Sequence, residues 1–107
     1  MILFSKNTLP VKPLDPPPTI EGDPKATEML RLWAAHNELQ VAINIGCYEE
    51  SEHDEAHAWG VILADCAKHV VNALKQRYGE DPDAALTRIR TAFLAEVDYP
   101  TQEVTGQ

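Results

Sequence analysis

Long apolar runs are absent from this 107-residue sequence. None approaches the roughly 18 to 20 residues that a membrane-spanning helix requires. The opening Ile2-Leu3-Phe4 is also far shorter than the core of an export signal, which runs for about 7 to 15 residues. Cysteine is scarce, and Cys47 and Cys66 are typical of reduced thiols in an unexported chain. These absences predict a cytoplasmic protein with no membrane partner.

Basic residues are also few. Nine Lys and Arg stand against 17 Asp and Glu, which gives a formal net charge of -8. Clustered Lys and Arg carry the binding of phosphate backbones, so we expect no nucleic acid partner. The sequence lacks a glycine-rich phosphate loop, a nucleophile elbow and a Cys-x-x-Cys pair. It therefore predicts no cofactor and gives no support to nucleotide, common hydrolase or redox chemistry.

The composition present is that of one folded domain. Hydrophobic residues make up 44% and charged residues 24%, close to the averages of globular proteins. Five of the eight prolines lie in the first 22 residues, and proline fixes φ and lacks an amide donor. We therefore predict an extended Pro-rich arm over residues 1–22, a single domain over residues 23–101 and a tail over residues 102–107.

The start of this domain indicates a β-hairpin. Apolar residues alternate strictly along residues 39–45, which is the period of a strand with one buried face. Residues 28–35 fit either a helix or a strand, because their apolar positions satisfy both periods. Asn37 lies between the two segments, and Asn tolerates the positive φ of tight turns. We favour a hairpin of residues 28–35 and 39–45 over a helix followed by a strand.

A long amphipathic helix is predicted over residues 54–78. Its start resembles a capping box formed by Ser51 and Asp54. Gly60 lies inside it, and an internal glycine usually marks the close approach of another group. The apolar side chains fall on one stripe at 100° per residue, so we expect them, including the Cys66 thiol, to lie in the core. The stripe consists of Trp59, Ile62, Leu63, Cys66, Val70, Ala73 and Leu74.

A second helix is predicted over residues 82–97. Gly79 ends the first helix, Asp81 can cap the second, and Pro82 suits its first position. So short a connection predicts an antiparallel helix pair. The predicted fold class is α+β, a β-hairpin packed on two antiparallel α-helices. Because two strands are marginal alone and leave open edges, we expect a homodimer to complete the sheet.

The densest group of titratable residues is the acidic segment of residues 49–57. Five carboxylates and two histidines fall within these nine residues. His53 and His57 stand one helical turn apart and are the candidate metal ligands, since His pairs at this spacing hold zinc or similar ions. The segment lacks the spacing of a zincin or a calcium loop. A solvated acidic helix start, favoured by the helix dipole, is the simpler interpretation.

A second pair, Asp65 and His69, is the candidate for acid-base catalysis. The two residues stand at i and i+4, where a carboxylate can orient an imidazole. A surface ion pair on the helix explains the spacing equally well. The neighbouring Cys66 points away from the pair by about 100°, so no nucleophile is predicted beside it.

Four segments of the sequence form a recognisable pattern: Leu30-Arg31-Leu32-Trp33, residues 58–65, Lys68-His69-Val70 and Tyr99-Pro100-Thr101. Together they resemble a family of small bacterial proteins classed as a domain of unknown function. The resemblance covers about residues 23–101. It implies the compact α+β arrangement. It implies no activity, because the family has none assigned. It includes Asp65 and His69 but not His53 or His57.

These observations together predict a small, acidic, uncharacterised bacterial protein of the cytoplasm that acts as a non-enzymatic, homodimeric interaction or accessory module. A protein partner would most readily meet the acidic residues 49–55. The alternative is a small enzyme or metal-binding protein that uses Asp65 and His69, or His53 and His57. An acidic surface that mimics nucleic acid ranks last, because the other carboxylates are scattered.

Overall fold

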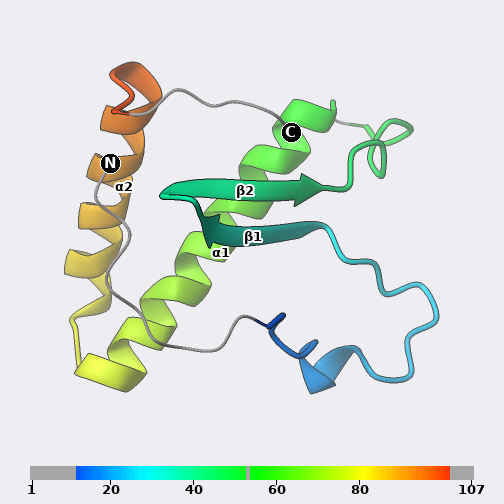
Figure 1. The fold of residues 1–107 in the computed structure, drawn as a ribbon, viewed down its shortest axis with the longest axis horizontal. Coiled ribbons are helices and arrows are strands. Elements are labelled where there is room, and N and C mark those ends of the chain that lie inside the picture. Colours follow the sequence, from blue (N-terminus) through cyan, green and yellow to red (C-terminus); the bar gives the residue numbers. More distant parts are fainter. Residues whose placement is uncertain (1–11, 53, 102–107) are drawn as a thin grey trace. The chain divides into compact units, whose positions relative to one another are not determined.

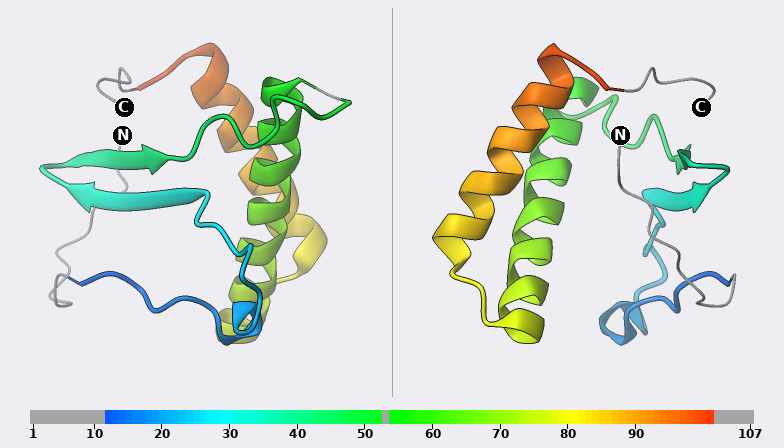
Figure 2. Two further views of the ribbon diagram at one scale, coloured as in Figure 1. Left: turned by 90° about the vertical axis from the view of Figure 1, so that its right-hand side faces the viewer. Right: turned by 60° about the vertical axis from the view of Figure 1, so that its left-hand side comes forward.

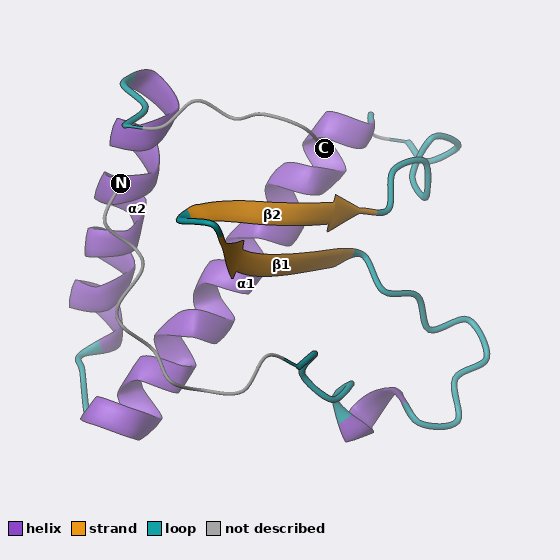
Figure 3. Cartoon of the chain, viewed as in Figure 1, coloured by secondary structure: helices purple, strands orange, loops and turns teal. Residues whose placement is uncertain are grey.

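The computed structural model describes residues 12–52 and 54–101. A β-hairpin precedes two α-helices in the chain (Figures 1 and 3), so the predicted α+β fold class is confirmed. The chain divides into two compact units, and the boundary falls between Ile45 and Gly46. The elements are η1 (Pro18–Ile20), β1 (Leu30–Ala35), β2 (Glu38–Ile43), α1 (Glu55–Tyr78) and α2 (Pro82–Asp98).

The hairpin unit contains β1 and β2, paired antiparallel from Leu30 opposite Ile43 to Ala35 opposite Glu38. The turn consists of His36 and Asn37, whose φ angles are 54° and 59°. Positive φ at both central residues is the requirement of the two-residue turn that best matches the twist of a hairpin. The preference for a hairpin over a helix in residues 28–35 was therefore correct, although the strands are shorter than expected.

The register divides the side chains of the hairpin between two faces. Three cross-strand pairs form what we call the apolar hairpin face: Leu30 with Ile43, Leu32 with Val41, and Ala34 with Leu39. Leu32 remains 56% exposed, Leu39 44% and Ile43 36%. Cross-strand apolar pairs stabilise a sheet when they are also covered. This face therefore still presents apolar area to solvent.

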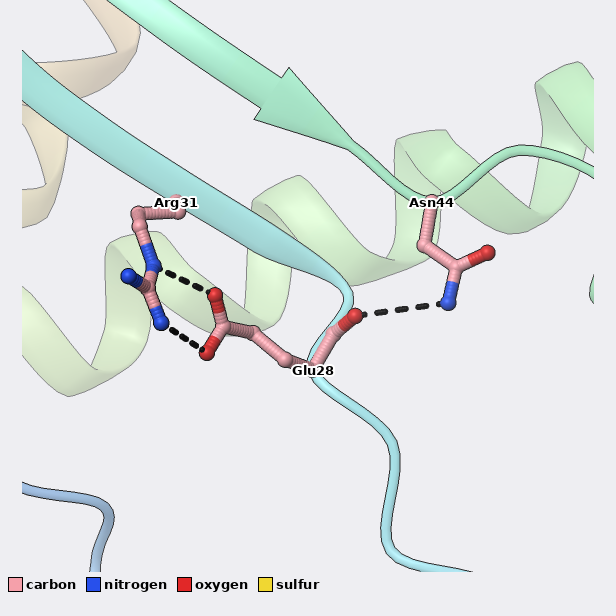
Figure 4. Close-up of polar contacts among 3 residues, drawn as sticks. All are labelled: Glu28, Arg31 and Asn44. Atoms are coloured by element: carbon pink, nitrogen blue, oxygen red, sulfur yellow. Dashed lines mark hydrogen bonds and ion pairs between the residues drawn. The ribbon is translucent and has the colours of Figure 1, made fainter.

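Polar contacts fix the open end of the hairpin. The Arg31 guanidinium donates from Nε and Nη2 to the two carboxylate oxygens of Glu28, at 2.6 and 2.7 Å (Figure 4). Asn44 donates from Nδ2 to the Glu28 carbonyl at 3.4 Å and from its amide to the Met29 carbonyl at 3.0 Å. The hydrogen bonds from Arg31 lower the pKa of the Glu28 carboxyl.

The first helix begins and ends at residues with clear physical roles. Asp54 is the N-cap, and its carboxylate accepts the His57 amide at 2.7 Å. The cap is therefore Asp54 rather than the Ser51 of the expected capping box. Gly79 closes the helix with φ 70°, a left-handed conformation that suits glycine, and its amide bonds the Lys75 carbonyl at 2.8 Å.

The second helix follows after a short turn. Asp81 caps it by accepting the Ala84 amide at 2.9 Å, and Pro82 takes its first position. Both features agree with the sequence prediction. Figure 2 shows α1 and α2 running in opposite directions, as so short a connection requires. Neither helix in the described part of the chain is long and apolar enough to cross a membrane.

The two helices pack only near the turn that joins them. Val71 of α1 and Ala85 of α2 are the buried residues of the described chain, at 6% and 2% exposed. The helices separate away from this contact (Figure 1), and residues 90–98 of α2 are all exposed. The predicted core stripe of α1 is therefore only partly right. Trp59, Ile62 and Leu74 are half-buried, whereas Leu63, Cys66, Val70 and Ala73 are exposed.

Candidate functional site

The acidic segment is organised around one carboxylate, that of Glu55 in the first turn of α1. Its Oε2 accepts the Gly46 amide at 2.9 Å and the Trp59 indole Nε1 at 3.2 Å, while its Oε1 accepts the Tyr48 amide at 3.0 Å. We call this arrangement the Glu55 clamp. It ties the connection that begins at Gly46 to the start of α1.

The clamp also sets the chemistry that Glu55 can perform. The hydrogen bond from Gly46, with those from Tyr48 and Trp59, lowers the pKa of the Glu55 carboxyl against the opposing effect of desolvation. A carboxylate with three donors is stabilised in its ionised form. It is thus a poor proton donor, and its oxygens are already occupied. Glu55 is best explained as a structural anchor.

The Glu55 clamp was not predicted from the sequence. Glu55 and Trp59 stand at i and i+4, which is a usable signal for a side-chain contact on a helix. Two of the three donors are backbone amides, however, and a sequence does not reveal which amides a carboxylate will meet. The positive φ of Gly46, at 110°, is part of the conformation that presents the first amide.

The candidate metal ligands are divided between described and undescribed residues. His53 lies outside the described residues. His57 is exposed, and its amide donates to Asp54. Within residues 12–52 and 54–101, no group of three or more His, Cys, Asp or Glu side chains is placed to hold a metal ion. Two members of the acidic segment already have other roles, since Asp54 caps α1 and Glu55 forms the clamp.

The candidate catalytic pair lies on the surface of α1. His69 Nε2 is 3.6 Å from Asp65 Oδ2, and the two side chains are 78% and 71% exposed. At this distance the contact is an ion pair when His69 is protonated and is too long for a hydrogen bond. Water screens such a pair, so it contributes little to stability. Neither side chain is enclosed.

Both cysteines are unpaired and exposed. Cys47 stands between the two residues whose amides the Glu55 clamp holds, and Cys66 follows Asp65 on α1. The expectation that Cys66 lies in a core is wrong for this chain, because the residue that α1 buries is Val71, which lies about 140° away from Cys66 around the helix.

Apolar side chains of both compact units are exposed in the described part of the chain. The hairpin unit contributes the apolar hairpin face, with Leu32, Leu39 and Ile43. The helical unit contributes a second set, which is more than one third exposed at each position. That set consists of Val61, Leu63, Val70, Phe93, Leu94 and Val97. Large exposed apolar areas of this kind usually mark sites of protein interaction.

The hairpin and the helix pair define a small protein of the α+β class. The family described as "Domain of unknown function (DUF5076)" matches residues 13–101, and the chain belongs to this family. The expected resemblance is therefore confirmed, and the match begins ten residues earlier than predicted, within the Pro-rich arm.

The chain is similar in sequence and fold to a solved structure. It is named "Structure of a putative pyruvate dehydrogenase from the photosynthetic bacterium Rhodopseudomonas palustrus CGA009". The two chains are 30% identical with a TM-score of 0.66, and the match covers 94% of this chain and 97% of the other. No curated protein matches the chain.

Proposed function

We propose that this chain is a non-enzymatic accessory module of the bacterial cytoplasm, and that it functions as a homodimer. The observation that carries the proposal is the apolar hairpin face, whose cross-strand pairs remain exposed. A two-stranded hairpin is marginally stable without a covering layer or further strands. A second copy supplies both, because it brings an identical hairpin and an identical set of apolar helix residues.

The free energies of burial and association favour a dimer contact that buries more than the apolar hairpin face alone. Full burial of a Leu or Ile side chain contributes roughly 1.5 to 3 kcal/mol, so a side chain that is already half-buried contributes on the order of 1 kcal/mol. Leu32, Leu39 and Ile43 from two copies would then supply about 6 kcal/mol. Association itself costs about 4 to 15 kcal/mol. A stable dimer therefore also needs the helix residues or new backbone hydrogen bonds.

The rival function is a small enzyme or metal-binding protein that uses Asp65 and His69, or His53 and His57. The name of the structural neighbour makes pyruvate the substrate to test. The exposure of Asp65 and His69 argues against catalysis, because enclosed sites are where acid-base groups are tuned. The exposed, unpaired cysteines are compatible with a reducing cytoplasm.

Sedimentation equilibrium of the untagged protein tests the proposal. We expect a dimer mass at micromolar concentration, with no metal by elemental analysis and no consumption of pyruvate in the presence of an electron acceptor. The doubly substituted Leu32→Ser, Leu39→Ser protein should shift to the monomer mass, while Glu21→Ser, on the exposed arm, should not. A wild-type monomer at high concentration, or turnover of pyruvate, would overturn the proposal.

A further inference from the structure

The outer edge of β2 carries backbone groups that point away from β1. In an antiparallel pair, opposite residues alternate between hydrogen-bonded and non-hydrogen-bonded pairs. The hydrogen bond from the Asn44 amide to the Met29 carbonyl fixes this alternation. Leu39, Val41 and Ile43 then occupy non-hydrogen-bonded positions, so their amides and carbonyls face outward.

Beyond its first residue, Glu38, this edge lacks the features that protect exposed edges in other proteins. Natural edges carry charges, prolines or bulges that prevent pairing with another strand. The sequence from Leu39 to Tyr48 contains no charged residue and no proline. On the other strand, Arg31 is the second residue of β1 and is held by Glu28. The edge of β2 is therefore the better surface for strand addition.

The net charge of the chain also indicates which partner can pair with the outer edge of β2. Two copies with a net charge of -8 each repel one another over most of their surfaces. The repulsion is smallest where neither copy presents a charge, as along the uncharged stretch that begins at Leu39. A basic partner, by contrast, would be attracted to the acidic segment and not to this edge.

We propose that two β2 strands pair antiparallel across a two-fold axis, with Val41 opposite Val41 of the second copy. This is the register that pairs all three outward-facing residues, because Leu39 then meets Ile43 of the other copy. It also places Glu38 opposite the neutral Asn44, so no carboxylates face each other across the strands. The six residues of the apolar hairpin face continue into those of the second copy. The inference rests on the proposed homodimer and specifies its interface.

Disulfide trapping tests the register. The background protein carries Cys47→Ser and Cys66→Ser, and one variant adds Val41→Cys. Opposite residues of a hydrogen-bonded pair have Cα atoms about 5.5 Å apart, within the roughly 4.4 to 6.8 Å range of disulfides. The control adds Gln40→Cys instead, which the register sets diagonally across from its copy at about 7 to 8 Å. Mild oxidation should link Val41→Cys at least tenfold faster than Gln40→Cys.

Each outcome has a distinct meaning. A dimer by sedimentation whose Val41→Cys variant does not crosslink overturns the β2 interface and leaves the homodimer proposal intact. Equal or faster crosslinking of Gln40→Cys overturns the register alone. A monomer overturns both proposals. A second test needs no substitution, so it does not depend on whether a variant folds. In a mixed sample of isotope-labelled and unlabelled chains, we expect a nuclear Overhauser contact between the Hα of Gln40 in one copy and the Hα of Ala42 in the other. A dimer that lacks this contact contradicts the register.

Discussion

The indole of Trp59 donates from Nε1 to the carboxylate of Glu55, one helical turn away, at 3.2 Å. The same carboxylate accepts the amides of Gly46 and Tyr48. One side chain thus links the first turns of α1 to the segment that precedes it. Two of the five carboxylates of the acidic segment, those of Asp54 and Glu55, have their physical explanation at this helix start, where negative charge also complements the dipole.

Glu55→Gln should lower the thermal unfolding midpoint. The amide that replaces the carboxylate retains one acceptor oxygen, so it leaves at least one of the Gly46, Tyr48 and Trp59 donors without its partner. Thermal melts followed by circular dichroism measure the midpoint, and Trp fluorescence reports the loss of the indole contact. Glu50→Gln, which changes an exposed residue in the same segment, serves as the control. Equal midpoints for the two variants would contradict a role for the clamp.

Stability should fall in acid through the same group. The folded-state pKa of Glu55 lies below its ordinary value of 4.5. A lowered pKa stabilises the folded state above the unfolded-state value, and that contribution is lost as pH falls through the folded-state pKa. We expect ionised Glu55 to contribute a constant stabilisation toward neutral pH. The thermal unfolding midpoint should then decline below about pH 4.5, as this contribution is lost. Glu55→Gln should show a shallower decline, with a remainder from Glu28 and Glu96, whose pKa values are also lowered.

Gly60→Ala should stabilise the protein by about 1 kcal/mol, because alanine is the better helix former. A Cβ added at Gly60 meets no atom of the described residues within 4 Å, so the close approach expected from the sequence is not present among them. The matched change Gly79→Ala should destabilise by about 1 to 2 kcal/mol, since the left-handed conformation at φ 70° strains any residue with a Cβ. Urea unfolding measures both. Destabilisation by Gly60→Ala would indicate that a second chain covers this side of α1.

Asp65→Asn and His69→Gln should each change the free energy of unfolding by no more than a few tenths of a kcal/mol, as exposed ion pairs on helices do. Both side chains are largely exposed. The dimer mass should also be unchanged. A large loss of any measured activity in both variants, with stability preserved, would favour the enzymatic alternative.

The turn chemistry of the fold was readable from the sequence. Asn37 in the hairpin turn, Gly79 at the end of α1 and Asp81 before Pro82 each act through local rules, and each has the predicted role. The roles of these residues depend on the local backbone conformation, so they can be predicted without knowledge of distant contacts.

Tertiary contacts were less predictable. A helical wheel assigned Cys66 and Val70 to the core of α1 and left out Val71, which is the residue that α1 buries most deeply. The wheel assumes that one partner covers the whole helix, whereas α2 departs from α1 beyond their contact near the turn. The Glu55 clamp was missed because Gly46 and Tyr48 donate from the backbone.

The difference between the two edges of the hairpin has a consequence for the size of any assembly. If identical β2 edges pair about a two-fold axis, the interaction consumes the same surface on both copies. What remains outermost is β1, which carries the charged Arg31 as its second residue. The assembly then closes at two chains instead of continuing into a fibril, because pairing uses up the β2 edge of both copies.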